Sequence, residues 1–281
     1  MLSIDGAELS WIREGEGPPV YVLGSSIYYP KAYSSELREH FELVFLDGRH
    51  FVPEYDPGED VLARLDISTF ADDVEALRRE LGHDVITVVG HSIHGQIALS
   101  YADRYPESTE ALVLIGAVPF RFSEFAEEAD QVWEELASQE RRDLLEERLA
   151  GLEARLAAAP TSRAFAESYD QRAPLYWADP AYDASYLLEG LEDGPAFAVL
   201  TSNLPTAEGA RARLERISAP TLLVLGKLDF AIPYLAWERL LQGVSGVDYV
   251  LLEEDSHNPQ TESPDRFDPV LIEWMAEHLP R

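Results

Sequence analysis

The stretch from Asp84 to Val118 constrains the fold of this chain more than any other. It begins with the short apolar run DVITVVG, continues with the helical pattern IALSYADRYP, which Pro106 closes, and ends with the apolar run EALVLIGAV. Short apolar runs next to turn residues are typical of buried strands. The order strand, helix, strand predicts parallel strands with a helix packed on a face of the sheet.

The same alternation extends on both sides of this stretch. Before it, AELSWIREG, PPVYVLGSS and FELVFLDGRH are expected strands, and DISTFADDVEALRRELG is an expected helix capped by Ser68 or Thr69 and stopped by Gly82. Near the C-terminus, APTLLVLGKLDFAIP and VDYVLLEEDSH are expected strands, followed by the expected helices YLAWERLLQGV and PDRFDPVLIEWMAEHL. These segments predict an α/β fold with a mostly parallel central sheet and helices on both faces.

A helical block interrupts the alternation. From about Phe120 to Leu214, apolar side chains recur at helical spacing with many charges between them. We therefore expect a core domain of residues 1–119 and 215–281 and a helical cap domain of residues 120–214. Open α/β sheets bind ligands at the carboxyl edge of the strands, so the cap is a candidate lid there. Its aromatic side chains are expected to pack in the core or between the domains: Tyr169, Tyr176, Trp177, Tyr182 and Tyr186.

The charge of the chain argues against a nucleic-acid partner. The 281 residues include 52 acidic and 22 basic side chains, which gives a formal net charge of −30. A polyanion would be repelled by such a surface. Lys31 and Lys227 are the only lysines. This composition fits a high-salt cytoplasm, where self-repulsion is screened, and fits equally a GC-rich genome that encodes arginine in place of lysine.

The chain has no cysteine, which excludes disulfides, thiolate nucleophiles and thiolate metal sites. The N-terminal segment MLSIDGAELSWIREGEG lacks the basic start and apolar run of a signal peptide, and no apolar stretch approaches the roughly 20 residues that cross a bilayer. We expect a cytoplasmic protein without a membrane partner, cofactor or metal ion. The sequence leaves the oligomeric state open.

Ser92 occupies the position of a candidate nucleophile. It lies at the turn between the strand DVITVV and the helix GQIALSYA, with Gly90 and Gly95 beside it. A serine held at the tip of such a strained turn has the geometry of a nucleophile elbow. A serine that attacks an ester or amide also needs a base, a group that orients the base, and donors for the developing oxyanion.

The base is expected to come from a distant part of the chain. His94 lies two residues after Ser92, and side chains at that spacing on a helix do not face each other. The side chain of His91, on the turn itself, is expected to project away. His257 directly follows the strand VDYVLLEE and reaches the carboxyl edge where Ser92 lies. The remaining histidines lie in expected helix ends or exposed loops, with surface or capping roles: His40, His50, His83 and His278.

Asp229 is the candidate for the residue that orients His257. It follows the strand PTLLVLG by a short loop and therefore reaches the same edge of the sheet. In a chain this acidic, a single aspartate is usually solvated surface. Its place between Ser92 and His257 distinguishes it, because serine, aspartate, histidine is the order of the triad in α/β-hydrolases.

With these residues in view, nearly the whole chain resembles the serine hydrolases of the α/β-hydrolase fold, most closely the proline iminopeptidase-like branch. The resemblance rests on FELVFLDGRHF, ISTFADDVEALRRELG, VVGHSIHGQIALSYADRYPE, ISAPTLLVLGKLDFAIPYLAWE and DSHNPQTESPDRFDPVLIEWM. It implies Ser92 as nucleophile, His257 as general base, Asp229 as its orienting acid, and the helical insert as a cap.

Two departures from the family pattern concern the elbow and the oxyanion hole. His94 stands where the family usually has a glycine, and VLGSSIYYP replaces the usual His-Gly-Gly-Pro-like loop. Alignment on Gly24 implies that the backbone N–H groups of Ser25 and Ile93 form the oxyanion hole, with Ser26 as the next candidate and a candidate substrate contact. Because the donors are backbone groups, the changed side chains are compatible with the activity.

In the proline iminopeptidase-like branch, carboxylates of the cap help to hold the free amino terminus of the substrate. The resemblance makes Glu189, Glu192 and Asp193 candidates for this role, although solvated surface is the more common role of such side chains.

Together these features predict a cofactor-independent serine hydrolase. It would cleave an ester, lactone or amide bond of a small molecule or short peptide through an acyl-enzyme, with proline iminopeptidase activity as one specific form. Two alternatives stay open, because a fold does not settle a function: a lyase on the same scaffold and a ligand-binding protein without turnover.

Overall fold

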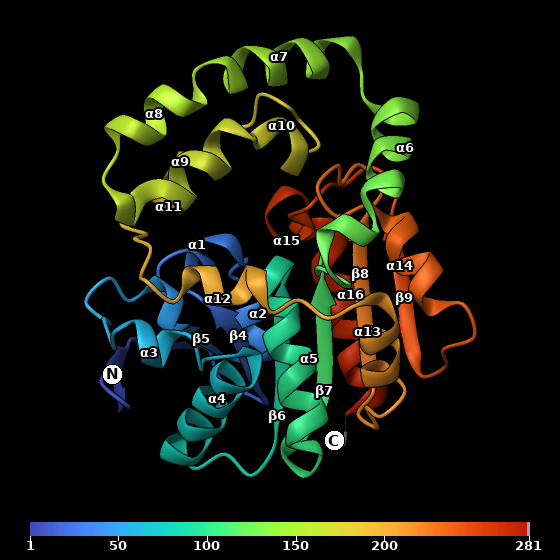
Figure 1. Cartoon of the computed structure of the whole chain (residues 1–281). Coiled ribbons are helices and arrows are strands. Elements are labelled where there is room, and N and C mark those ends of the chain that lie inside the picture. The colour runs from blue at the N-terminus through green and yellow to red at the C-terminus, as the bar shows by residue number, and fades with distance from the viewer. Residues whose placement is uncertain (280–281) are drawn as a thin grey trace.

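The computed structural model describes residues 1–279. The central sheet has seven strands in the order β3-β5-β4-β6-β7-β8-β9, and β1 and β2 form a separate two-stranded sheet. Figure 1 shows the central sheet with helices around it. Only β3 runs antiparallel to its neighbour in the large sheet. The strands are β1 (Leu2–Ile4), β2 (Ala7–Leu9), β3 (Trp11–Glu14), β4 (Pro19–Gly24), β5 (Glu42–Asp47), β6 (Ile86–His91), β7 (Thr109–Ile115), β8 (Thr221–Gly226) and β9 (Val247–Leu252). The prediction of a mostly parallel sheet is confirmed.

Helices alternate with these strands and cover both faces of the sheet (Figure 1). They are α1 (Tyr29–Ala32), α2 (Leu37–His40), α3 (Glu59–Leu62), α4 (Ile67–Leu81), α5 (Gly95–Arg104), α6 (Ala126–Leu136), α7 (Gln139–Ala150), α8 (Leu152–Ala158), α9 (Ala164–Gln171), α10 (Ala173–Tyr176), α11 (Ser185–Leu188), α12 (Phe197–Ser202), α13 (Ala207–Leu214), α14 (Tyr234–Leu241), α15 (Pro259–Glu262) and α16 (Pro264–His278). Among residues 1–279, none of these helices is long and apolar enough to cross a membrane.

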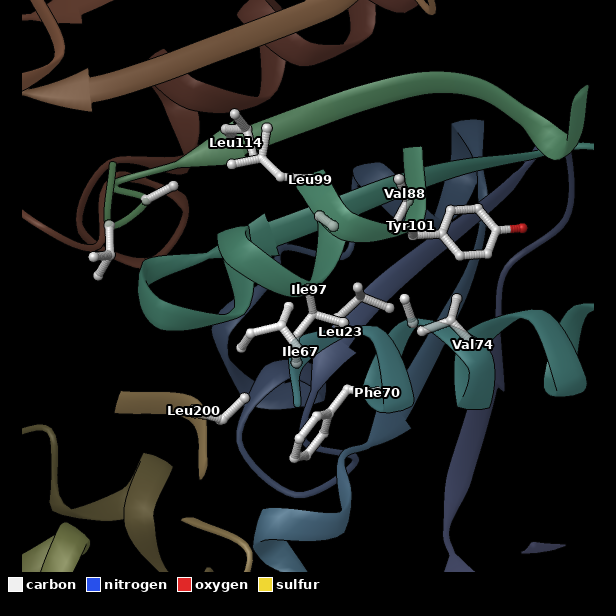
Figure 2. Close-up of a cluster of buried hydrophobic side chains, with 14 of the residues drawn as sticks. Leu23, Ile67, Phe70, Val74, Val88, Ile97, Leu99, Tyr101, Leu114 and Leu200 are labelled. Atoms are coloured by element: carbon white, nitrogen blue, oxygen red, sulfur yellow. The ribbon is translucent and has the colours of Figure 1, made fainter. Parts of the chain in front are cut away.

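The strands of the sheet have two apolar faces because consecutive side chains of a strand point in opposite directions. On β6, Val88 lies in one buried cluster with Val74 of α4 and Ile97 of α5 (Figure 2). The next residue, Val89, lies in a second buried cluster with Leu271 of α16. A strand covered on both faces is apolar at most positions, which is why DVITVVG is a nearly continuous apolar run rather than an alternating one.

Helix α4 begins earlier than the sequence indicated. Its N-cap is Asp66, whose carboxylate accepts hydrogen bonds from the backbone N–H groups of Ser68 and Thr69. A carboxylate at this position satisfies amides that have no partner within the helix. The expected caps Ser68 and Thr69 are therefore wrong as N-caps, although Thr69 completes the capping box. The expected stop at Gly82 is confirmed, because this residue has the left-handed φ of 76° that closes many helices.

Residues 120–214, the expected cap, hold the helices α6 to α13. Helices α6 to α10 lie beyond one end of the sheet in Figure 1. By contrast, α13 packs against α5 and α14 of the expected core domain. Its side chains Ala210 and Leu214 belong to the same buried cluster as Val88 of β6. The helix adjoining the predicted boundary at residue 214 thus packs with the central sheet.

Candidate active site

Ser92 follows β6 directly and has a positive φ of 54°. This left-handed conformation is rare for a residue with a side chain and is often found at functional sites. Two glycines allow the turn, because a Cβ atom on Gly90 would lie 2.6 Å from Cα of Gly95, and one on Gly95 would lie 2.5 Å from Cβ of Ala117. Gly95 thus allows a close approach next to position 94, where the family usually has a glycine and this chain has His94.

Asp229 and His257 form a hydrogen-bonded pair at the carboxyl ends of β8 and β9. Nδ1 of His257 lies 2.6 Å from Oδ2 of Asp229, and each side chain is 1% exposed. The other carboxylate oxygen of Asp229 accepts backbone N–H bonds from Ala231 and Ile232 at 2.9 and 2.8 Å. These two bonds hold the carboxylate in place. Because Nδ1 of His257 is bonded to this carboxylate, Nε2 is the ring nitrogen that has no hydrogen-bond partner among residues 1–279.

Ser92 and His257 line one cavity of about 720 Å³. Its core side also includes Ser25, His91 and Ile93, and its other side includes Phe165, Ser168, Tyr169, Arg172, Tyr176 and Phe197 from the helical segment. No hydrogen bond joins Oγ of Ser92 to His257 within residues 1–279. In proteins without substrate, a nucleophile and its base are often further apart than in the substrate complex.

The two histidines beside Ser92 are bonded to other groups. Nε2 of His91 lies 2.9 Å from the backbone oxygen of His257, and its Nδ1 lies 3.2 Å from the hydroxyl of Tyr29. Nδ1 of His94 lies 2.8 Å from the same hydroxyl, and its Nε2 lies 2.9 Å from Nε2 of His50. All four ring nitrogens therefore have partners other than Ser92.

These contacts form one chain of hydrogen bonds with a single consistent direction. Burial lowers the pKa of His94 to about 3 and holds the pKa values of His50 and His91 well below their usual range, so all three rings are neutral at pH 7. The carbonyl of His257 can only accept, so His91 donates from Nε2 and accepts at Nδ1 from Tyr29. Tyr29 then accepts from Nδ1 of His94, whose Nε2 accepts from Nε2 of His50. We call this set the histidine–tyrosine chain.

His50 corrects an expectation of the sequence analysis. Its segment is an expected helix end or exposed loop, with a surface or capping role for the side chain, but the side chain is fully buried. Helical residues 120–214 cover it, because the backbone N–H of Gly194 donates to the backbone oxygen of His50 at 2.7 Å. His94, which replaces the usual glycine, lies against the loop after β4: a Cβ atom on Gly24 would lie 2.4 Å from its ring. Only a glycine at position 24 leaves room for this imidazole.

Tyr29→Phe tests the histidine–tyrosine chain. The variant leaves a buried donor on His94 and a buried acceptor on His91 without partners, and we expect the free energy of unfolding to fall by about 1–3 kcal/mol. Tyr33→Phe is the matched control, because the hydroxyl of Tyr33 is buried and has no hydrogen-bond partner among residues 1–279. Urea unfolding of both variants measures the difference. Equal losses of stability would contradict the proposed bonding.

The oxyanion candidates differ in their hydrogen bonding. Ser25 and Ile93 line the cavity, and within residues 1–279 the N–H of Ser25 donates to no acceptor. The hydroxyl of Ser25 accepts from the N–H groups of Ile27 and Tyr28, both at 3.0 Å, and shapes the loop. Ser26 is directed elsewhere, because its N–H and hydroxyl both donate to the buried carboxylate of Asp47, at 2.5 and 3.0 Å. Ser26 does not line the cavity, which argues against it as a substrate contact.

The carboxylates expected to bind an amino terminus are not among the residues that line the cavity of Ser92. Glu189 and Glu192 are exposed and neither lines the cavity. Asp193 is half-buried, accepts the backbone N–H of Phe165 at 2.6 Å, and has its pKa raised to about 6 by burial. The structure therefore does not bring Glu189 and Glu192 to this cavity, and their role as substrate contacts stays a prediction from the resemblance.

Several residues that the sequence analysis did not single out lie beside the candidate site. Asn258 follows His257 and accepts a hydrogen bond from the hydroxyl of Tyr28 at 3.1 Å. Its amide donates to the hydroxyl of Tyr169 and the backbone oxygen of Tyr176, at 3.0 and 3.1 Å, and so joins the His257 loop to the helical segment. The expectation that Tyr169 and Tyr176 only pack is incomplete, because both line the cavity.

Comparison with known proteins identifies the family. Residues 57–264 match the family described as alpha/beta hydrolase fold. The AB hydrolase superfamily protein YclE of Bacillus subtilis is 29% identical over 285 residues, which cover 97% of each chain. The putative carbamate hydrolase RutD of Serratia proteamaculans is 26% identical, over 91% of this chain and 88% of its own.

The fold agrees with solved structures. A thermophilic esterase from Thermogutta terrifontis superposes with a TM-score of 0.69 at 19% identity, over 97% of this chain and 94% of its own. At this identity the likeness concerns the fold alone. The family match over most of the chain, together with the order and arrangement of the strands, shows that this protein is an enzyme of the α/β-hydrolase fold family.

Proposed function

We propose that the chain is a serine hydrolase that cleaves an ester bond of a small substrate, with Ser92 as nucleophile, His257 as general base and Asp229 as the residue that orients the base. The observation that carries this proposal is the buried His257–Asp229 pair, 2.6 Å apart, at a cavity that Ser92 also lines. The left-handed backbone of Ser92 supports it, since a strained serine between a strand and a helix is the elbow geometry.

The reaction proceeds in two halves. Oγ of Ser92 attacks the carbonyl carbon while Nε2 of His257 takes its proton, and Asp229 stabilises the imidazolium through Nδ1. The tetrahedral intermediate collapses, the imidazolium protonates the leaving alcohol, and an acyl-serine remains. Water, deprotonated by Nε2, then attacks the acyl carbon; collapse of the second intermediate releases the acid and returns the proton to Oγ.

The backbone N–H groups of Ser25 and Ile93 are the proposed donors to the oxyanion. Preorganised donors of this kind contribute on the order of 10²–10³ in turnover each. The histidine–tyrosine chain supports their placement, since the ring of His94 packs on Gly24, the residue before Ser25, and His94 itself follows Ile93. In this proposal His94 is a positioning residue between the two donors, and the base is His257.

The cavity favours esters over the substrates of a proline iminopeptidase. No aspartate or glutamate is among the residues that line it within the described chain, whereas a free amino terminus requires an anionic partner. Many of its lining side chains are aromatic or aliphatic, which suits an apolar acyl or alcohol group. Lactones and amides follow the same two steps, and the names of relatives add carbamates to the substrates worth testing. A cytoplasmic location stays a prediction from the sequence.

Labelling with a fluorophosphonate tests the nucleophile. We expect the folded protein to form one covalent adduct at Ser92, found by peptide mass spectrometry, because an activated serine attacks the phosphorus centre. Ser92→Ala and urea-unfolded wild type are the controls and are expected to remain unlabelled. A folded wild-type protein without an adduct at Ser92 would overturn the proposal and favour the ligand-binding alternative.

A further inference from the structure

Arg172 brings a positive charge to the cavity. It is the one arginine or lysine among the lining residues of the described chain, and no carboxylate lines the same space. It follows α9, whose Phe165 and Ser168 also line the cavity. Residues at this spacing share one face of a helix, so the guanidinium lies on the cavity side of the helical segment.

Two of the three guanidinium nitrogens of Arg172 have no hydrogen-bond partner among residues 1–279. Nη1 donates to the backbone oxygen of Ser168 at 3.4 Å and to its hydroxyl. Nε and Nη2 donate to no acceptor among residues 1–279. Two other arginines of the helical segment are bonded to the backbone instead. Arg141 donates to the backbone oxygens of three residues, and Arg163 donates to those of two.

The chain also leaves Arg172 without an acidic partner. Although the sequence has 52 acidic residues, no carboxylate lies within ion-pair distance of Arg172 in the described residues. Arg172 lies at the C-terminal end of α9, where the helix dipole favours a cation. Its Nη1 interacts with this end of the helix by donating to the backbone oxygen of Ser168. This leaves a planar pair of donors, Nε and Nη2, which matches the geometry of a carboxylate.

Arg172 lies near the proposed catalytic groups. Tyr176, four residues further on, packs its ring 5.3 Å from the imidazole of His257, centroid to centroid. Burial raises the pKa of Tyr176 to about 12, and the positive charge of Arg172 acts in the opposite direction, as expected of a near neighbour. A substrate within one cavity can therefore reach Ser92 with its scissile carbonyl and Arg172 with a second group.

We propose that Arg172, together with the hydroxyl of Ser168, forms an anion subsite that binds a carboxylate carried by the substrate. The preferred substrates are then esters with a free carboxylate on the acyl or the alcohol side. This inference rests on the proposed ester hydrolase function. Recognition by a paired guanidinium would be strong in this cavity, because apolar walls weaken the competition from water.

Two pairs of esters test the subsite. 4-Nitrophenyl hydrogen adipate is compared with 4-nitrophenyl heptanoate, and 4-acetoxybenzoate with its methyl ester. We expect wild type to prefer the anionic member of at least one pair by tenfold or more in kcat/KM. Arg172→Gln should reduce kcat/KM for that anionic ester by on the order of 10- to 100-fold more than for its neutral partner, chiefly through KM.

Controls separate charge from structure. Arg155→Gln removes the same charge from an exposed position of the helical segment and is expected to leave the preference unchanged. Arg172→Lys keeps the charge but lacks the paired donors, so we expect partial recovery of the preference. The neutral ester reports whether Arg172→Gln still folds into an active protein. Equal kcat/KM for both members of both pairs in wild type would overturn the anion subsite.

A binding measurement separates this inference from the hydrolase proposal. Calorimetry with Ser92→Ala and each of the two anionic esters needs no turnover, and we expect Arg172→Gln in the same background to weaken the binding of at least one of them by at least tenfold. If wild type hydrolyses no ester but Ser92→Ala shows this Arg172-dependent binding, the subsite stands and the hydrolase proposal fails. Hydrolysis without any dependence on Arg172 overturns the subsite alone.

Discussion

Replacing His257 by alanine is expected to lower turnover on the order of 10⁶-fold, whereas His94→Ala should cost less than about 10²-fold in the folded protein. Loss of a general base removes proton transfer from the serine and leaves only the residual contribution of the oxyanion hole and binding. His94 has no nitrogen left for Ser92, because both are bonded to Tyr29 and His50. Steady-state kinetics with a 4-nitrophenyl ester measures both variants.

His94→Ala is expected to lower the stability of the protein more than its turnover, unlike His257→Ala. It leaves partners in the histidine–tyrosine chain unpaired and buried, so we expect its main effect on the free energy of unfolding, a loss of about 1–3 kcal/mol. Turnover is therefore normalised to the folded fraction, measured by circular dichroism. A loss of turnover in His94→Ala as large as that in His257→Ala would transfer the role of base to His94.

Asp229→Asn is expected to lower kcat by on the order of 10⁴-fold while the protein remains folded. The amide oxygen of asparagine can still accept the N–H groups of Ala231 and Ile232, which Oδ1 of Asp229 accepts at 2.9 and 2.8 Å. The amide nitrogen then faces Nδ1 of His257 and favours the tautomer in which Nε2 carries the proton. That tautomer cannot take the proton of Ser92.

Asp73→Asn is the matched control for Asp229→Asn. Asp73 is also a buried carboxylate, bonded to Arg49 at 2.7 and 2.8 Å, but it lies on α4 and does not line the cavity. Breaking a buried ion pair costs stability, so we expect a lower melting temperature with kcat per folded molecule nearly unchanged. An equal loss of kcat in both variants would contradict the specific role of Asp229.

The elements that could be predicted from the sequence depend on local patterns. The parallel sheet follows from apolar runs such as DVITVVG alternating with helical segments, and the position of Ser92 follows from the turn between β6 and α5. His257 and Asp229 could be chosen because each follows a strand, and parallel strands bring their carboxyl ends to one edge. The 2.6 Å contact between them fits that expectation.

The parts that could not be predicted depend on contacts between distant segments. His50 is buried because residues near Gly194, far along the chain, fold over it. Tyr29 bridges His91 and His94 because the loop after β4 returns across the elbow, and the pattern SSIYYP has no periodicity that indicates this. Glu189 and Glu192 are candidates only through the resemblance to the proline iminopeptidase-like branch, and no local pattern indicates that both side chains are exposed.

The sequence by itself determined the α/β framework and the three residues proposed for chemistry, because strand periodicity, turn chemistry and chain order are properties of neighbouring residues. Only the tertiary structure decided what surrounds them: a cavity lined, within residues 1–279, by Arg172 and by no carboxylate, a buried chain of three neutral histidines and a tyrosine, and Ser26 turned toward Asp47. These features arise where loops from separate strands meet the helical segment, and no local pattern encodes which side chains face each other there.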